Sequence, residues 1–332
     1  MDRAYTAYGL RLLTDGNIPG LPPWTPAPPA ETLPVDVRVH LNKMPAKAPS
    51  SEQTLWYQSS GLNQQGRPNL VIWRIVPRGA FHFVYDNQTE FLIEPDGSQV
   101  WCNWPEPATV ADTSLYLRGP ILGFTLRMRG VLCLHASAIA LGPSAIAVVG
   151  PPGAGKSTTA AGFVKLGYSL VADDVAALRE EGERFYVSPG YPQLNLWPDA
   201  VETVYGDARA SSRLTPIGGI NDWWDKRYVD LEGDGQFHRS PLPLAAVYLL
   251  GERTTDADAA RVAPLSPQDA FIWLTSETYV NYALDESMRA KEFQALGHLV
   301  RTTPIRLVNP PDHSARLLDL CHSILADYQG LA

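Results

Sequence analysis

Gly150-Pro151-Pro152-Gly153-Ala154-Gly155-Lys156-Ser157 is the stretch that decides the fold, and it stands between an apolar run at residues 145–149 and an Ala-rich segment. The eight residues match the pattern G-x-x-x-x-G-K-[ST], in which glycines let the backbone curl so that several N–H groups point inward. The pattern is informative where a strand precedes it and a helix follows it. We therefore predict a strand over residues 145–149, a phosphate-binding loop, and a helix over residues 157–166.

A loop of this kind binds a nucleoside triphosphate, ATP or another, together with Mg²⁺. The N–H groups of the loop and the positive end of the following helix attract phosphate oxygens. We expect Lys156 to reach the β- and γ-phosphates and the Ser157 hydroxyl to take a place on the magnesium ion. The predicted nucleotide-binding residues are Gly150, Pro151, Pro152, Gly153, Ala154, Gly155, Lys156, Ser157 and Thr158. Because such a loop contacts the phosphates and not the base, its sequence does not distinguish ATP from GTP.

Two adjacent acids, Asp173 and Asp174, follow a predicted strand at residues 169–172. A hydrophobic strand that ends in acid shortly after a phosphate loop is the place where a magnesium ligand or a catalytic base is expected. A further candidate is His135, which we place at the end of a predicted strand over residues 131–134. A histidine after an apolar run is more often a core or edge residue than a functional one.

Three pieces of sequence together resemble the kinase domain of the HPr kinase/phosphorylase family. They are His135, the loop from Gly150 to Ser157, and the run Gly-Tyr-Ser-Leu-Val-Ala-Asp-Asp at residues 167–174. The match covers mainly residues 131–178, with weaker similarity to about residue 250. The resemblance implies a P-loop kinase domain that transfers phosphate from ATP, with Mg²⁺, to a serine hydroxyl of a protein. It also makes a homo-oligomer plausible.

The resemblance further implies a role for each candidate residue. Asp173 would be the base that takes the hydroxyl proton, and Asp174 would lie near the metal with Ser157. His135 would lie beside the γ-phosphate or the base. A basic loop near the active site corresponds to Asp225-Lys226-Arg227-Tyr228, close to Trp223 and Trp224, and Arg227 is the candidate cation for the transferring phosphoryl group.

The chain also departs from the family. Thr158 stands where the family usually has Glu, and the Gly-rich signature after the two acids is represented only by residues 188–195. These departures speak against the reverse, phosphorolytic activity. The N-terminal half differs too, which speaks against HPr as the substrate. The layout is similar to HPr-kinase-like proteins of peptide natural-product pathways, including lasso-peptide tailoring kinases, which phosphorylate a serine of a precursor peptide.

Two alternatives remain open. A small-molecule kinase is one, because a phosphate loop does not reveal the acceptor. A nucleotide-dependent switch or assembly ATPase is the other, with the N-terminal half as a partner-binding module. The acids together with His135 favour a kinase, because a switch ATPase more often uses water-positioning groups on later loops.

The rest of the chain predicts two domains. Residues 1–110 form a mainly β N-terminal domain with a Pro-rich arm at residues 18–31, and residues 111–332 form an α/β P-loop domain. An antiparallel meander is predicted at residues 70–76, 80–85, 90–94 and 99–104, and a helix at residues 113–128 contains the disruptive pair Gly119-Pro120. Later strands are predicted at residues 244–250 and 304–308, and later helices after the N-cap Ser266, at residues 285–300 and at residues 312–328.

Composition limits the class of protein. The 332 residues are 45% hydrophobic with a formal net charge of −8, which argues against disorder and against a nucleic-acid partner. Cys102, Cys133 and Cys321 have no spacing typical of a disulfide framework or a zinc site. The chain begins without the apolar run of a secretory signal, and its longest apolar segment, residues 136–149, is too short to cross a bilayer. We therefore expect a cytoplasmic protein with no membrane partner.

Overall fold

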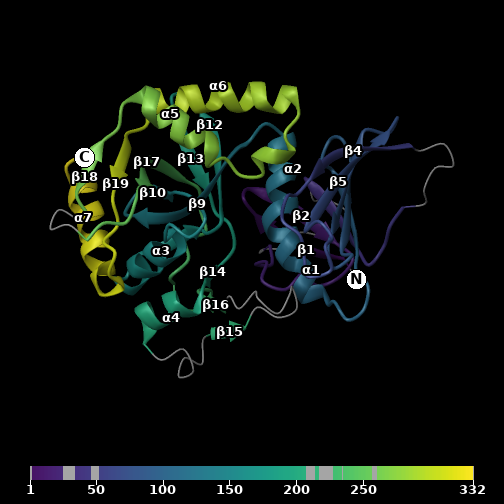
Figure 1. Ribbon diagram of the computed structural model, residues 1–332, viewed down its shortest axis with the longest axis horizontal. Coiled ribbons are helices and arrows are strands. Elements are labelled where there is room, and N and C mark those ends of the chain that lie inside the picture. Colours follow the sequence, from purple (N-terminus) through teal and green to yellow (C-terminus); the bar gives the residue numbers. More distant parts are fainter. Residues whose placement is uncertain are drawn as a thin grey trace. The chain divides into compact units, whose positions relative to one another are not determined.

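The computed structural model describes residues 2–24, 34–45, 52–206, 214–216, 227–233, 235–255 and 260–331. These residues form two compact units, labelled by element in Figure 1. The first unit contains the described residues up to Gly130 together with Val280–Met288, and the second contains the other described residues from Val131 on. The mixed sheets and helices agree with the predicted α/β class.

The first unit is built on a mixed eight-stranded sheet with the order β1-β2-β3-β8-β7-β6-β5-β4. Strands β5 to β8 pair antiparallel, and this confirms the predicted meander to within one residue at the strand ends. Strand β3 instead pairs parallel to both β2 and β8. The strands are β1 (Arg3–Ala7), β2 (Leu10–Thr14), β3 (Val37–Leu41), β4 (Glu52–Gln58), β5 (Leu70–Val76), β6 (Ala80–Tyr85), β7 (Glu90–Ile93) and β8 (Gln99–Asn103).

The Pro-rich arm predicted at residues 18–31 is described as far as Trp24, and residues 25–31 lie outside the described residues. Its described end lies along the edge strand β1. The N–H of Trp24 donates to the carbonyl of Ala4 (2.9 Å), and the N–H of Thr6 donates to the carbonyl of Pro22 (3.3 Å). A segment that takes up the backbone groups of an edge strand protects that edge from pairing with another chain.

One helical segment packs on this sheet. It begins as α1 (Val110–Tyr116), where Thr109 and Asp112 form a capping box. Pro120 has no N–H and cannot continue a regular α-helix. The chain therefore passes through a π-helical turn, Leu117–Ile121, and continues as α2 (Leu122–Met128). The predicted conflict at Gly119-Pro120 is resolved by this turn, without a break in the helix.

The helical segment belongs to the first unit and not to the second. The ring of Phe124 meets those of Phe81 and Phe83 edge to face, with ring centroids 4.8 and 5.1 Å apart. Because this apolar face packs on the first sheet, the compact unit extends to Gly130, beyond the boundary near residue 110 expected from the change of pattern.

The second unit contains the phosphate-loop motif. Strand β10 (Ser144–Val149) pairs antiparallel with β9 (Leu132–Leu141) on one side and parallel with β17 (Leu242–Leu250) on the other. Strand β19 (Ile305–Val308) also runs parallel to β17. Because parallel strands end at the same edge of a sheet, the loops after β10, β17 and β19 leave the sheet at one edge.

The other elements of this unit complete the sheet, cover it or form a small separate sheet, β14-β16-β15. They are α3 (Lys156–Lys165), β11 (Ser169–Ala172), β12 (Val175–Glu181), β13 (Arg184–Ser188), β14 (Gln193–Leu196), α4 (Pro198–Tyr205), β15 (Leu214–Pro216), β16 (Arg227–Asp230), β18 (Val262–Pro264), α5 (Pro267–Ser276), α6 (Glu286–Thr302) and α7 (Leu317–Gln329). The N-cap predicted at Ser266 is confirmed, because its side chain accepts from the N–H of Asp269.

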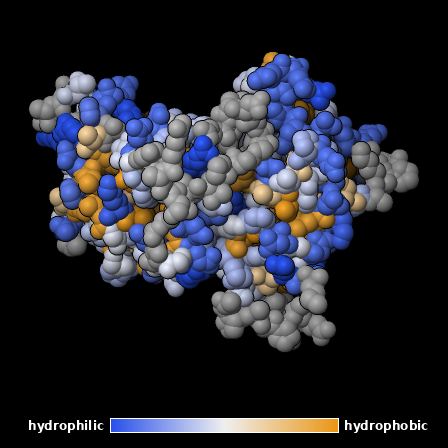
Figure 2. Space-filling view, turned by 90° about the horizontal axis from the view of Figure 1, so that it is seen from below, coloured by the Kyte–Doolittle hydropathy of each residue, from blue (hydrophilic) through white to orange (hydrophobic). Residues whose placement is uncertain are grey.

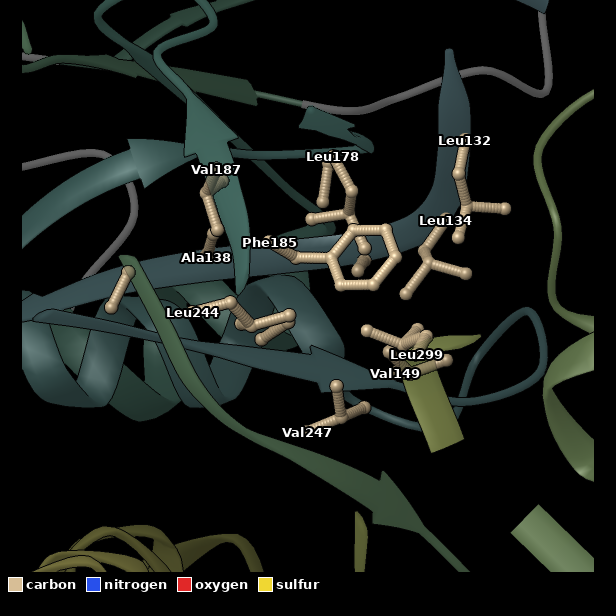
Figure 3. Close-up of a cluster of buried hydrophobic side chains, with 14 of the residues drawn as sticks. Leu132, Leu134, Ala138, Val149, Leu178, Phe185, Val187, Leu244, Val247 and Leu299 are labelled. Atoms are coloured by element: carbon tan, nitrogen blue, oxygen red, sulfur yellow. The ribbon is translucent and has the colours of Figure 1, made fainter. Parts of the chain in front are cut away.

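Two apolar layers hold the second unit together. Helices α3 and α7 cover one side of the strands, and α5 and α6 cover the other (Figure 1). The layer on the α5 and α6 side contains Leu134, Phe185 and Val247, which point into a common cluster in Figure 3. Residues of β10 alternate between the two layers, so the strand that leads into the phosphate loop is buried on both faces.

Strand β9 is longer than predicted. It does not end at Leu134 but continues to Leu141, because the small residues at positions 136–138 fit between neighbouring strands, with Ser137 opposite Val148 of β10. His135 therefore lies inside a strand, opposite Val175 of β12, and not at a strand end as expected.

On the face seen in Figure 2, hydrophobic residues lie in separate patches among hydrophilic ones. All three cysteines are buried free thiols. Among the described residues, no helix is long and apolar enough to span a membrane.

Candidate functional site

The phosphate-loop motif forms a tight turn between β10 and α3. Gly153 and Gly155 have φ angles of 82° and 106°, in the left-handed region that favours glycine. Gly150 is packed so closely that a methyl group added there would lie 3.2 Å from the carbonyl oxygen of Leu250. Among the described residues no side chain caps the start of α3, so the N–H groups of its first turn are left for a ligand.

The predicted cation lies over this turn. Lys156 is largely buried, and its Nζ donates to the carbonyl oxygens of Gly150 (2.7 Å) and Pro151 (3.2 Å). The next residues, Ser157 and Thr158, lie in the first turn of α3. The predicted nucleotide-binding residues therefore surround one helix N-terminus, and the ammonium group is held by the carbonyl groups at the start of the loop.

Asp173 is enclosed by three hydrogen-bond donors. The hydroxyls of Ser137 and Ser157 both donate to its Oδ1, at 2.7 and 2.9 Å, and the backbone N–H of Asn195 donates to Oδ2 (3.1 Å). Only 2% of the residue's surface is exposed. Three donors around a buried carboxylate stabilise its ionised form and fix its orientation. The carboxylate therefore faces the phosphate loop through Ser157.

Asp174 has a different environment. Its backbone is left-handed, with a φ angle of 68°. The hydroxyl of Tyr279 donates to Oδ2 (2.7 Å), and Nε2 of His135 lies 3.4 Å from Oδ1. About a third of the side chain, 34%, is exposed. Asp174 is thus an accessible carboxylate that is positioned by two polar rings.

The partners of Asp174 are themselves held by β9. The N–H of His135 donates to the carbonyl of Glu277, and the N–H of Tyr279 donates to the carbonyl of Cys133, both at 2.8 Å. The rings of His135 and Tyr279 meet edge to face with centroids 5.8 Å apart. Because the backbone of residues 277–279 is fixed along β9, the tyrosine hydroxyl is presented to Asp174 by a rigid element.

Sequence reasoning missed three residues of this site: Ser137, Asn195 and Tyr279. One of them carried a usable signal, because Ser137 stands two positions after His135 and alternate residues share one face of a strand. The other two are brought in by long-range pairing. Tyr279 is 105 residues away from Asp174 along the chain.

Arg227 begins strand β16, where it pairs with Leu196 of β14, one position beyond Asn195. The predicted cation is therefore on the strand next to the one that binds Asp173. The rest of the predicted basic and aromatic loop, Trp223 to Lys226, lies outside the described residues.

The chemistry of the site suits a magnesium–nucleotide complex. Among the described residues no cluster of three or more His, Cys, Asp or Glu could hold a metal by itself. Magnesium commonly binds through one or two protein oxygens, several waters and the phosphates of a nucleotide, so Ser157 and Asp173 are a sufficient protein contribution. Beside them, Oδ1 of Asn195 is buried without a hydrogen-bond donor among the described residues. A metal-bound water could supply that donor.

No family model matches the chain, and no curated protein matches it. Among solved structures, the chain is similar to the Hpr(Ser) kinase/phosphatase from Coxiella burnetii, with 15% sequence identity over 60% of this chain and 90% of that chain. The TM-score of this match is 0.32.

Proposed function

We propose that the protein is a magnesium-dependent phosphotransferase that moves the γ-phosphoryl group of ATP, or another nucleoside triphosphate, to a hydroxyl group. The observation that carries this proposal is the contrast between two adjacent acids. Asp173 is enclosed and tied to the phosphate loop, whereas Asp174 is accessible and held by His135 and Tyr279. Two carboxylates whose environments differ so strongly suit two different roles in one reaction.

The nucleotide is held by the loop in this proposal. N–H groups of the loop and of the first turn of α3 bind phosphate oxygens, and Lys156 exchanges the carbonyls of Gly150 and Pro151 for the β- and γ-phosphates. Magnesium neutralises phosphate charge when it is bound, and Ser157 and Asp173 hold it. Arg227, on the strand next to Asn195, is the proposed cation for the transferring group.

The geometry favours an assignment of the two acids opposite to the one implied by the family resemblance. Asp173 accepts three hydrogen bonds and is buried, so it has little freedom to reach an incoming hydroxyl. Asp174 is accessible. We therefore assign the metal to Asp173 and the general base to Asp174.

Asp174 then takes the proton of the acceptor hydroxyl as the acceptor oxygen forms its bond to the γ-phosphorus. The bond from that phosphorus to the β,γ-bridging oxygen breaks, and the nucleoside diphosphate leaves. His135 and Tyr279 keep the carboxylate pointed at the acceptor throughout. General-base catalysis of this kind contributes about 10²–10⁴ in rate.

The acceptor that we propose is a serine hydroxyl of a peptide or protein, and a precursor peptide of a natural-product pathway is the first candidate. Support for this choice comes from the sequence resemblance of His135, the phosphate loop and residues 167–174. A small-molecule kinase and a switch ATPase would give different products in the same assay.

The test is a transfer assay with labelled ATP and Mg²⁺, using peptides encoded beside the gene as acceptors and mass spectrometry of the products. We expect one added phosphate on a peptide serine. Asp174→Asn should lower turnover by about 10²–10⁴ while nucleotide affinity is kept. Glu183→Gln is the matched control, because Glu183 is 90% exposed on a hairpin turn, and it should retain full turnover.

Normal turnover of Asp174→Asn, in a variant whose melting temperature is unchanged, would return the base to Asp173. Release of free phosphate without a modified acceptor would instead favour the switch ATPase.

A further inference from the structure

The loop after β17 runs beside the phosphate loop. Strands β10 and β17 are parallel neighbours, with Val149 opposite Leu249, so the chain leaves both strands at the same edge. The two loops are in close contact there, since a methyl group added to Gly150 would lie 3.2 Å from both Cβ and the carbonyl oxygen of Leu250. The short segment that follows, Gly251-Glu252-Arg253, therefore lies against the mouth of the phosphate loop.

The backbone on both sides of Arg253 is anchored. The N–H of Gly251 donates to the carbonyl of Val308 (2.9 Å). Thr254 is held through both of its backbone groups: its N–H donates to the carbonyl of Pro310 (3.0 Å), and its carbonyl accepts from the N–H of Asp312 (2.9 Å). Arg253 thus stands on a short, fixed segment, which is how functional side chains are held with precision.

The guanidinium group of Arg253 lies over Gly155. A methyl group added to Gly155 would be 3.4 Å from Nη2 of Arg253. Gly155 immediately precedes α3, so this cation is within contact distance of the turn that we assign to phosphate. Arg253 is exposed, and with the other described residues it makes no hydrogen bond or ion pair.

Arg253 and the two acids lie on opposite sides of β10. Asp173 and Asp174 follow β11, which pairs with β9, and β9 is the neighbour of β10 on one side. Arg253 follows β17, the neighbour on the other side. A triphosphate that lies over the loop with its γ-phosphate at the acids has its nucleoside end away from them, and β17 with Arg253 lies on that opposite side of β10.

We infer that Arg253 binds the nucleoside end of the bound nucleotide, the α-phosphate and the face of the base, and so selects a nucleotide over bare polyphosphate. The inference rests on the proposed function, because it takes the γ-phosphate to lie at Asp174. A planar guanidinium suits both contacts, since it donates bidentately to phosphate oxygens and stacks on aromatic rings.

The experiment compares the affinities of ATP and inorganic tripolyphosphate, both with Mg²⁺, for the full chain and its variants. Arg253→Ala should weaken ATP binding by roughly tenfold or more, an effect typical of one lost charge-assisted contact, and weaken tripolyphosphate binding clearly less, because tripolyphosphate fills the α-phosphate position but offers no base to stack on. Arg253→Lys should recover only part of the ATP affinity, because lysine keeps the charge but not the planar donor set. Lys156→Ala, as a reference, should weaken both ligands.

Arg184→Ala is the matched control, since Arg184 is an exposed arginine of the same unit at the start of β13. It should change neither affinity. An equal loss of ATP and tripolyphosphate in Arg253→Ala would overturn the assignment to the nucleoside end, and no loss of either would overturn any role for Arg253. If the wild-type protein binds neither ligand, the proposed function itself fails, and this inference fails with it.

Discussion

The hydroxyl of Ser157 donates a hydrogen bond of 2.9 Å to Oδ1 of Asp173, and the hydroxyl of Ser137 donates to the same oxygen at 2.7 Å. Two serines on one carboxylate oxygen give a matched pair of variants, because only Ser157 lies in the phosphate-loop motif. Ser137 orients the acid from β9. Ser157 connects the acid to the place where magnesium is proposed.

Ser157→Ala should therefore abolish the gain in nucleotide affinity that magnesium gives, whereas Ser137→Ala should keep most of it. The physical reason is that the Ser157 oxygen is a proposed metal ligand, while Ser137 only supports the carboxylate. Titration of nucleotide with and without Mg²⁺ measures the gain directly. If both variants retain it, Ser157 is not a metal ligand.

Tyr279→Phe tests a positioning role for the tyrosine that donates to Asp174. We expect kcat to fall by about tenfold, corresponding to about 1.4 kcal/mol, while KM for the nucleotide stays unchanged. The acidic limb of the pH–rate profile should move to higher pH, because the removed hydrogen bond stabilised the ionised carboxylate. Tyr186→Phe, on β13, is the control. If Tyr279 has only a structural role, Tyr279→Phe should lower stability and leave the acidic limb of the pH–rate profile at the same pH.

Gly155→Ala should damage both stability and nucleotide binding. The φ angle of 106° is unfavourable for a residue with a side chain, by roughly 1–2 kcal/mol, and the new methyl group would approach Arg253. Gly297→Ala is the control, because Gly297 lies inside α6, where Ala is favoured by up to about 1 kcal/mol. Thermal melting with and without nucleotide gives the comparison. If Gly155→Ala has the melting temperature and the nucleotide affinity of the wild type, the turn tolerates a different conformation.

The local features of this fold were predictable because each one is encoded within a few neighbouring residues. The meander strands end at turn residues, Ser266 caps α5 through Asp269, and two glycines of the phosphate loop allow the backbone to curl by adopting the left-handed conformation. The full length of β9 was not predictable, because its run of Ala and Ser at positions 136–138 lacks the bulky residues that are typical of a strand. Its burial comes from β10 and β11 on either side.

The sequence predicted some of the residues that lie together here, but not the contacts between them. Sequence placed His135 and both acids near the phosphate loop, and the structure brings His135 and Asp174 together. The backbone enters the left-handed region at Asp174, and the two acids contact different partners: Asp173 accepts from Ser157, and Asp174 accepts from Tyr279. Nothing in an Asp-Asp pair specifies that turn, and nothing near residue 279 indicates that its hydroxyl reaches back to residue 174. Such long-range contacts depend on the assembled sheet.

The strands that support the phosphate loop and the loop of Arg253 are fastened to the last helix by a polar cluster. Arg306 of β19 forms an ion pair with Asp327 of α7, and the hydroxyl of Tyr248 of β17 donates to Oδ2 of the same aspartate (3.0 Å). Burial raises the pKa of Tyr248, and the carboxylate of Asp327 raises it further, so the phenol stays protonated and able to donate.

Asp327→Ala should destabilise the protein by about 3–5 kcal/mol, because it leaves a largely buried guanidinium without its carboxylate and the hydroxyl of Tyr248 with only the longer contact to the carbonyl of Ile324 (3.4 Å). Helix α7 also provides the control. Asp319 forms an ion pair with Arg316 near the start of the same helix, but its side chain is 60% exposed, against 13% for Asp327. Asp319→Ala should therefore change stability by less than about 1 kcal/mol. Urea unfolding of both variants measures the difference. Equal effects would mean that the cluster around Asp327 is solvated like a surface pair and that α7 is held to β17 and β19 by apolar packing alone.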